Sequence, residues 1–174
     1  ISPPAVASEF AAEGTVAHSL AALLVTRKTN DRALRQRVSA IIIQEGFEIE
    51  ITEEMVNAAI EYRDTIAKDT VEMDAEDRGG KIIGKAEVLV HAKSIDLALY
   101  GTADYLLYQK GNLLRVYDFK YGKGVAVSCE ENEQMAIYAL AAMDTEAGKA
   151  FDTVELVIVQ PRAGGESVRR WVAP

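Results

Sequence analysis

The feature that most constrains the fold is a pair of strand-forming segments joined by a short polar break. Residues 102–108 and 113–120 are rich in β-branched and aromatic side chains, and residues 109–112, Gln-Lys-Gly-Asn, separate them. Such a break predicts a β-hairpin. A loop of three residues, Lys-Gly-Asn, pairs the strands so that Asp104 lies opposite Asp118.

The alternation of side chains along these strands predicts a face with an apolar end and a charged end. The apolar members are Leu106, Tyr108, Leu114 and Val116, and the charged members are Asp104, Asp118 and Lys120. Two carboxylates on neighbouring strands repel each other unless a cation lies between them. One interpretation of the pattern is a divalent metal site in which Lys120 orients or activates the attacking water. The alternative is an Asp–Lys ion pair at a sheet edge, and spacing alone does not choose between the two.

Four short motifs resemble those of one nuclease family. Residues 101–104, GTAD, and residues 118–120, DFK, resemble the two central motifs of the PD-(D/E)XK nuclease superfamily. Residues 134–138 are similar to the Gln-x-x-x-Tyr motif of its RecB-like exonuclease branch, and residues 14–18 to the Gly-x-x-x-His helix of that branch. The string DFKYGKG at residues 118–124 is similar to phage-encoded members of the branch.

The resemblance implies roles for individual residues. The catalytic residues would be Asp104, Asp118, Lys120 and Gln134. One or two Mg²⁺ or Mn²⁺ ions would be bound by His18, Asp104, Asp118 and the backbone carbonyl of Phe119. Two further candidates are Glu87, where related nucleases often carry a glutamate, and Tyr138, which helical spacing places beside Gln134. The alternatives are a solvent-facing strand position for Glu87 and a core position for Tyr138.

DNA binding requires cationic partners for backbone phosphates. The candidates are Lys123, in a glycine-rich turn, and the C-terminal Arg162, Arg169 and Arg170. The formal net charge of −8 argues against tight, sequence-independent binding of duplex DNA by the domain alone. We therefore expect a short strand or a linear end to be bound, including single-stranded DNA. A homo-oligomer or a recombination or replication partner would supply further affinity.

Hydrophobic periodicity and capping residues predict the remaining elements. Three helices are expected over residues 8–28, 30–44 and 52–68, the second with Leu34, Val38, Ile41 and Ile42 as its buried stripe. An acidic loop at 72–80 follows, then a strand over 81–92, with residues 94–100 beginning the next strand or bending into it. A helix over 130–147 closed by Gly148, and strands over 154–159 and 169–172, complete the chain.

The predicted fold is α/β, a mixed central sheet of about five strands flanked by helices, restriction-endonuclease-like as the resemblance implies. A chain of 174 residues suits a single domain, with a helical N-terminal part (about 1–70) and a sheet and catalytic core (about 81–174). The single cysteine excludes both an internal disulfide and an iron–sulfur cluster. We expect no membrane span and no signal peptide, and hence the cytoplasm of a bacterium or phage-infected cell.

The predicted function is a Mg²⁺- or Mn²⁺-dependent DNA exonuclease that hydrolyses phosphodiester bonds. One alternative is a structure-selective endonuclease or resolvase on the same fold. Another is an inactive module that binds DNA or a partner. The Asp–Asp–Lys set argues against the inactive module, because a protein without catalysis has no need to keep two repelling carboxylates together.

Overall fold

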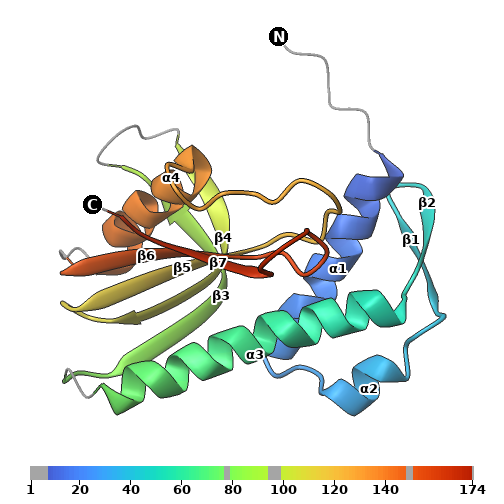
Figure 1. Ribbon diagram of the computed structural model, residues 1–174, viewed down its shortest axis with the longest axis horizontal. Helices are drawn as coiled ribbons and strands as arrows, with labels where there is room; N and C mark the ends of the chain where they lie inside the picture. Colours follow the sequence, from blue (N-terminus) through green and yellow to red (C-terminus); the bar gives the residue numbers. More distant parts are fainter. Residues whose placement is uncertain (1–7, 77–78, 94–98, 148–150, 174) are drawn as a thin grey trace, which may run out of the picture.

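A mixed five-stranded sheet with strand order β3-β4-β5-β6-β7 forms the centre of the molecule (Figure 1). The computed structural model describes residues 8–76, 79–93, 99–147 and 151–173. The strands are β3 (Ile82–His91), β4 (Tyr100–Gln109), β5 (Leu113–Phe119), β6 (Thr153–Val159) and β7 (Val168–Ala173). Strands β5 and β6 are parallel, and the other neighbours are antiparallel. The predicted α/β class with a mixed central sheet is therefore confirmed.

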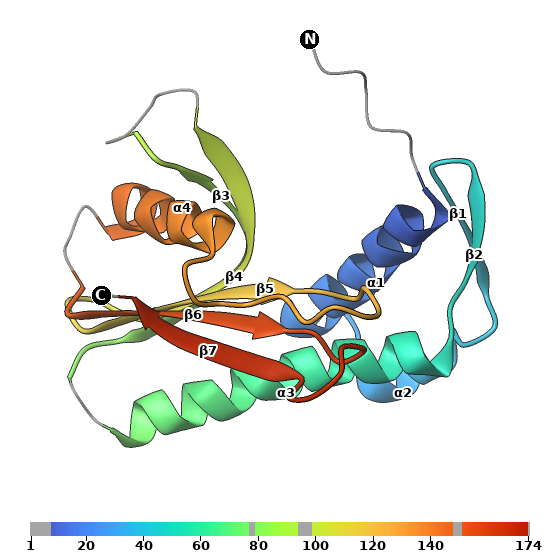
Figure 2. The same ribbon diagram turned by 45° about the horizontal axis from the view of Figure 1, so that its top comes forward.

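Helices cover both faces of this sheet (Figures 1 and 2). Helices α1 (Glu9–Val25) and α3 (Glu53–Ala75) share one buried cluster with one face, and α4 (Glu133–Ala142) shares a second cluster with the other. A π-helical turn, η1 (Met143–Ala147), follows α4. Because both faces are covered, β5 and β6 are almost continuously apolar and buried. The N-terminal helices and the sheet thus share a core.

The predicted hairpin is present with the expected register. Gln109 pairs with Leu113, and the intervening loop places Gly111 at a φ of +80°. The regular ladder runs as far as Tyr105 and Tyr117, so Asp104 and Asp118 lie one step beyond its last pair. The predicted apolar end is also confirmed, because its members pack in the cluster under α4: Leu106, Tyr108, Leu114 and Val116.

The predicted helix over residues 30–44 is wrong beyond its first turns. Only α2 (Asp31–Arg35) is helical, and β1 (Ile41–Gln44) forms a two-stranded hairpin with β2 (Phe47–Glu50). The turn residues Glu45 and Gly46 both have positive φ, at 51° and 85°, as a two-residue hairpin turn requires. This turn and the β-branched Ile-Ile-Ile run favour strands over helix. Ile41, expected to be buried, is 56% exposed.

Other boundaries differ by small amounts. Thr52 caps α3 as predicted, accepting a hydrogen bond from the Met55 backbone N–H at 3.1 Å. The helix continues to residue 75 and takes up the start of the predicted acidic loop. Helix α4 begins at residue 133, after the capping Asn132. The expected start of a strand at 94–98 and the closing Gly148 lie outside the described residues. Within the described ranges, no helix combines the length and apolarity needed to cross a membrane.

A buried carboxylate fixes α3 to the sheet. Asp69 is 1% exposed and accepts hydrogen bonds from the Tyr117 hydroxyl at 2.7 Å and from Arg170 at 2.8 and 3.0 Å. Arg115 lies 3.9 Å from the same carboxylate and pairs with Glu155. This network orients the helix that forms one wall of the candidate site.

Candidate active site

Four of the predicted site residues meet at the end of the β4–β5 ladder. Asp104 lies in β4, Asp118 near the end of β5, Lys120 directly after β5, and His18 in α1. The Nδ1 atom of His18 is 3.6 Å from Asp104 Oδ1. The Nζ atom of Lys120 is 3.2 Å from Asp118 Oδ1 and 3.0 Å from Asp118 Oδ2. The predicted Asp–Asp–Lys grouping and its neighbouring histidine are therefore close together in space.

The backbone of β5 holds Asp104 in place. The Phe119 backbone N–H donates to Asp104 Oδ2 at 2.7 Å, just beyond the last regular ladder pair. The Phe119 ring is buried and makes an edge contact with the His18 ring, at 5.3 Å between centroids. Phe119 thus contacts both Asp104 and His18, which explains its place between the two charged residues of the Asp-Phe-Lys motif. Metal ligation by its carbonyl stays a prediction.

The two carboxylates are poorly solvated. The Asp104 side chain is 16% exposed and the Asp118 side chain 7%. Burial and the charge of Asp118 together raise the pKa of Asp104 to about 7, despite the opposing hydrogen bond from Phe119. Burial lowers the pKa of His18 below its ordinary value, so the imidazole is neutral at pH 7 and available as a ligand.

The donor set fits a hard divalent cation with some nitrogen affinity. Two carboxylates and a neutral imidazole suit Mg²⁺ and Mn²⁺. The Oδ2 atom of Asp118 is buried and accepts no well-aligned hydrogen bond from the described part of the chain, although the Lys120 ammonium lies nearby. Among the described residues, no three His, Cys, Asp or Glu side chains are already arranged to hold a metal ion. Because Lys120 already forms an ion pair with Asp118, a cation at this site would compete with Lys120 for this carboxylate.

Glu87 lies opposite Asp104 in the β3–β4 register, at the one step where the pairing is interrupted. Its φ of +52° is unusual for a residue with a side chain and marks local strain. The regular alternation of side chains is broken here. Ile83 and Val88 are an odd number of positions apart, five, and yet pack against the same cluster on one face of the sheet. The charge of Glu87 also contributes to the raised pKa of Asp104. Metal binding by Glu87 stays a prediction. The sequence analysis did not predict the strained backbone at this residue.

The predicted pairing of Gln134 and Tyr138 on one face of α4 is confirmed. Gln134 Nε2 donates to the Tyr138 hydroxyl at 3.0 Å. The Tyr138 ring lies against Gly101, where a Cβ atom would come within 2.6 Å of Tyr138 Cε1. The glycine of the GTAD motif therefore permits close contact between α4 and β4. The structure does not bring Gln134 into contact with the carboxylates, so its role toward phosphate stays a prediction.

Sequence reasoning missed Tyr62, a buried tyrosine of α3. Its ring lies 5.0 Å from that of Phe119, and its hydroxyl is buried without a hydrogen-bond partner in the described structure. Burial, and secondarily the charges of Asp104 and Asp118, raise its pKa. The only sequence signal was a tyrosine among the small and aliphatic residues of the buried side of α3.

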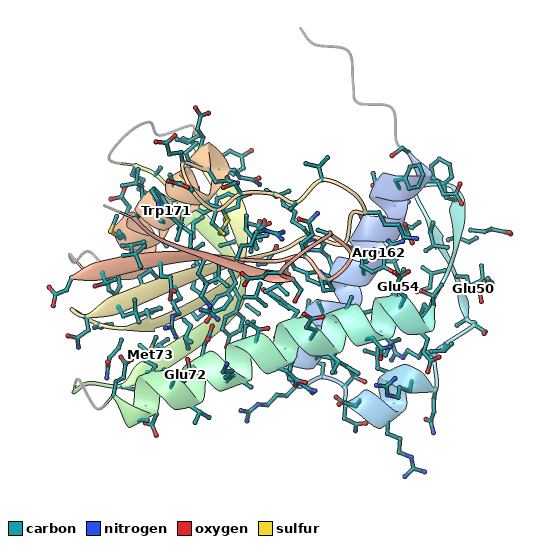
Figure 3. All side chains as sticks on the ribbon, in the orientation of Figure 1. Glu50, Glu54, Glu72, Met73, Arg162 and Trp171 are labelled. Atoms are coloured by element: carbon teal, nitrogen blue, oxygen red, sulfur yellow. The ribbon has the colours of Figure 1, made fainter. Side chains whose placement is uncertain are left out.

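Arg162, one of the predicted DNA contacts, is held inside the protein. Its side chain is 8% exposed and stacks on the Tyr121 ring, with the guanidinium carbon 4.1 Å from the ring centroid. It also donates to the Tyr121 carbonyl at 3.2 Å and to Glu13 at 3.3 Å. Figure 3 shows it beside Glu54, whose carboxylate lies 3.3 Å from its Nε atom.

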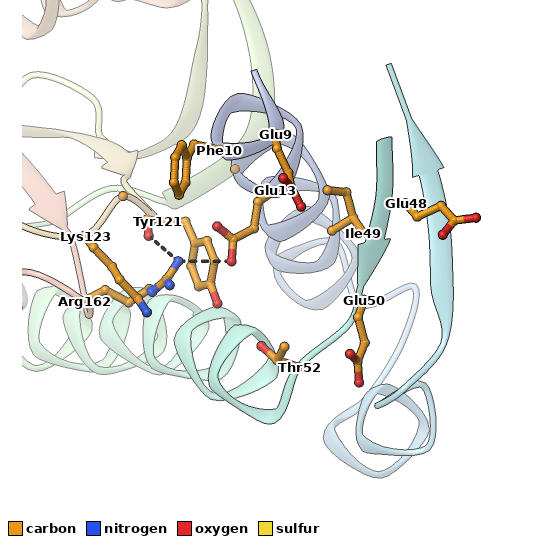
Figure 4. A pocket seen from close by; sticks show the side chains of 12 residues that line it. Glu9, Phe10, Glu13, Glu48, Ile49, Glu50, Thr52, Tyr121, Lys123 and Arg162 are labelled. Atoms are coloured by element: carbon orange, nitrogen blue, oxygen red, sulfur yellow. Dashed lines mark hydrogen bonds and ion pairs between the residues drawn. The ribbon is translucent and has the colours of Figure 1, made fainter. Parts of the chain in front are cut away.

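Arg162 forms part of the wall of an open pocket of about 880 Å³ (Figure 4). Exposed Lys123 lines the same pocket, together with Phe10. Its carboxylates come from Glu9, Glu13, Glu48 and Glu50. Because the carboxylates outnumber the cations, this pocket is a poor site for phosphate.

The other two predicted arginine contacts also have internal partners. Arg169 donates to the Val127 carbonyl at 2.8 Å and to the Glu166 carbonyl at 2.6 Å. Arg170 pairs with Asp69 at 2.8 Å. Phosphate contacts by either residue stay predictions and would require these bonds to be exchanged.

The family comparison covers the whole described site. A family model described as "Protein of unknown function (DUF2800)" matches residues 3–173. The match includes the helix that carries His18, the β4–β5 hairpin and helix α4. The chain therefore belongs to the DUF2800 family.

Proposed function

We propose that the protein is a metal-dependent nuclease that hydrolyses phosphodiester bonds of DNA and acts on linear ends. The observation that carries the proposal is the buried pair Asp104 and Asp118 with Lys120 alongside and one carboxylate oxygen lacking a well-aligned hydrogen bond. Repelling, desolvated carboxylates are costly to maintain, and a divalent cation relieves the cost. The resemblance to PD-(D/E)XK nucleases points to the same chemistry and, through its RecB-like branch, to exonuclease action.

The metal-binding residues would be Asp104, Asp118 and His18. A bound Mg²⁺ or Mn²⁺ polarises phosphoryl oxygens and lowers the pKa of water. The hydrogen bond from the Phe119 N–H leaves Asp104 Oδ1 facing His18, so this oxygen and the neutral imidazole are both available as donors.

Lys120 would act on the water and the phosphate. Its side chain is 31% exposed, and its ammonium is held 3.0 Å from Asp118, where it can orient a water and stabilise negative charge that develops on the phosphoryl oxygens. Gln134 would hold the phosphate, with Tyr138 restricting the orientation of its amide.

The test compares end-labelled linear DNA with covalently closed circular DNA, each with Mg²⁺, with Mn²⁺ and with a chelator. The variants are Asp118→Ala and Lys120→Ala, with Lys110→Ala in the exposed hairpin loop as the matched control. The proposal expects metal-dependent loss of linear DNA that both site variants abolish and the control retains. Cutting of the circle would replace exonuclease by endonuclease action at the same site.

Calorimetry with Mn²⁺ supplies an independent measurement. Binding should be lost in Asp104→Ala and Asp118→Ala and retained in Lys110→Ala. Inactivity toward both DNA forms, together with absence of metal binding that depends on these two aspartates, would leave a non-catalytic binding module as the better description.

A further inference from the structure

A cationic segment interrupts an otherwise acidic chain. Residues 27–37 contain five cationic side chains and one anionic side chain, a net charge of +4, in a chain whose net charge is −8. The cationic residues are Arg27, Lys28, Arg32, Arg35 and Arg37, and all five are exposed. We refer to this segment as the 27–37 track.

The charges of the 27–37 track are largely available. Its one carboxylate, Asp31, is taken up by Arg63 from α3, at 2.7 and 3.0 Å. Arg35 contacts Asn57 at 3.0 Å and lies 3.9 Å from Glu53. The other four cations, Arg27, Lys28, Arg32 and Arg37, enter no ion pair with the described parts of the chain. In this respect they contrast with the internally bonded arginines near the C-terminus.

The track begins near the candidate active site. Arg27 lines an open pocket of about 560 Å³ with Gly84 of β3 and Tyr105 of β4, the residue that follows Asp104. The pocket also contains one carboxylate, that of Asp74 in α3. Val25, the last residue of α1, lies seven positions after His18, which is roughly 10 Å at 1.5 Å per helical residue, and Arg27 follows two residues later. The helical part of this path corresponds to about three nucleotide steps of a DNA strand.

The other end of α1 has the opposite charge. The pocket beside its first turns is lined by Glu9, Glu13, Glu48 and Glu50 (Figure 4). Phosphates are therefore repelled on one side of His18 and attracted on the other. Figure 1 shows the chain passing from the end of α1 farthest from the N-terminus into α2, at the periphery of the molecule.

We propose that the 27–37 track binds the phosphate backbone of a DNA strand and directs it away from the active site along the C-terminal end of α1. The inference rests on the proposed nuclease function for the position of the scissile phosphate. Binding through phosphate contacts is sequence-independent, because the phosphate backbone carries no direct information about the bases. A local track also explains how an acidic protein can bind a polyanion.

Binding is tested without catalysis, in chelator, by fluorescence anisotropy of a labelled single strand of about 20 nucleotides between about 50 and 200 mM salt. The variant is Arg32→Gln/Arg37→Gln. The matched control, Lys68→Gln/Lys110→Gln, removes the same charge from exposed positions elsewhere. The track variant should bind about 5- to 50-fold more weakly at low salt, and its log–log salt slope should be lower by about 1 to 1.4. Equal weakening by both double variants would overturn the proposal.

A small substrate separates this inference from the proposed function. Bis(p-nitrophenyl) phosphate reaches the active site but is too short to reach the track. With Mn²⁺, the track variant should hydrolyse it at the wild-type rate and degrade a long strand more slowly. If the wild type hydrolyses no phosphodiester while the track variant alone loses strand binding, the track stands and the nuclease proposal falls. Unchanged binding and degradation of long strands in the track variant would overturn the track whether or not the enzyme is active.

Discussion

Asp104→Asn should stabilise the metal-free protein above pH 7 while abolishing nuclease activity. The Asp104 carboxyl is buried beside Asp118, and these two causes raise its pKa from 3.8 to about 7. The neutral form is therefore preferred in the folded state. The stability that the protonated Asp104 carboxyl contributes is fully present below the pKa of this group in the unfolded chain. It is lost as pH rises through the pKa of the group in the folded protein. Asparagine avoids that loss and can still accept the Phe119 N–H bond through its own Oδ1.

The size of the effect follows from the pKa difference. At about 1.4 kcal/mol per pKa unit, a shift of roughly three units corresponds to about 4 kcal/mol as an upper limit. Relaxation of the site and entry of water reduce this figure, and we expect a gain of about 1–3 kcal/mol at pH 8. Near pH 4 the difference should be small, because the folded wild type is then already neutral at this position.

The assay is urea denaturation followed by circular dichroism, in chelator, at pH 8 and near pH 4. The control is Asp152→Asn, which removes an exposed carboxylate. Added Mn²⁺ should then raise the unfolding midpoint of the wild type but not that of Asp104→Asn, because only the wild type retains the full ligand set. Equal stability of wild type and Asp104→Asn at pH 8, or an equal gain at both pH values, would refute the assignment of a strained carboxylate pair.

Three further substitutions test individual contacts. Tyr62→Phe removes a buried hydroxyl that has no hydrogen-bond partner among the described residues, so the free energy of unfolding should stay unchanged or rise by about 1 kcal/mol in urea titrations; a clear loss would mean that the hydroxyl is bonded. Gly101→Ala places a Cβ atom 2.6 Å from Tyr138 and should destabilise the protein by about 1–3 kcal/mol, with partial recovery when Tyr138 is also replaced by alanine. Thermal unfolding of the single and double variants measures this coupling, and its absence would contradict the contact. Asp69→Ala removes a buried carboxylate from the Tyr117 hydroxyl, the largely buried Arg115 and the more exposed Arg170, and should cost about 2–4 kcal/mol by denaturant unfolding, whereas a cost below about 1 kcal/mol would mean that the network contributes little.

The errors in the sequence-based prediction concern places where local preference is ambiguous or distant partners decide. The sequence of residues 41–44 is compatible with either a buried helical stripe or a strand. In the structure these residues form a strand of a hairpin, whose two-residue turn has positive φ at Glu45 and Gly46. The positive φ at Glu87 coincides with the interrupted pairing step opposite Asp104, which no local pattern specifies. The family resemblance identified the candidate site residues, but it did not predict which side chains surround them.

By itself, the sequence determined the β4–β5 hairpin and its register, because turn chemistry and a period of two are local properties. It also grouped Asp104, Asp118 and Lys120, and it located the Thr52 cap. Only the tertiary structure decided which cations are free to meet a ligand. Arg162 and Arg170 are bound by carboxylates from elements far away in the sequence, whereas Arg32 and Arg37 are exposed and enter no ion pair with the described residues. Ion pairing is a contact between distant segments, and composition cannot reveal it.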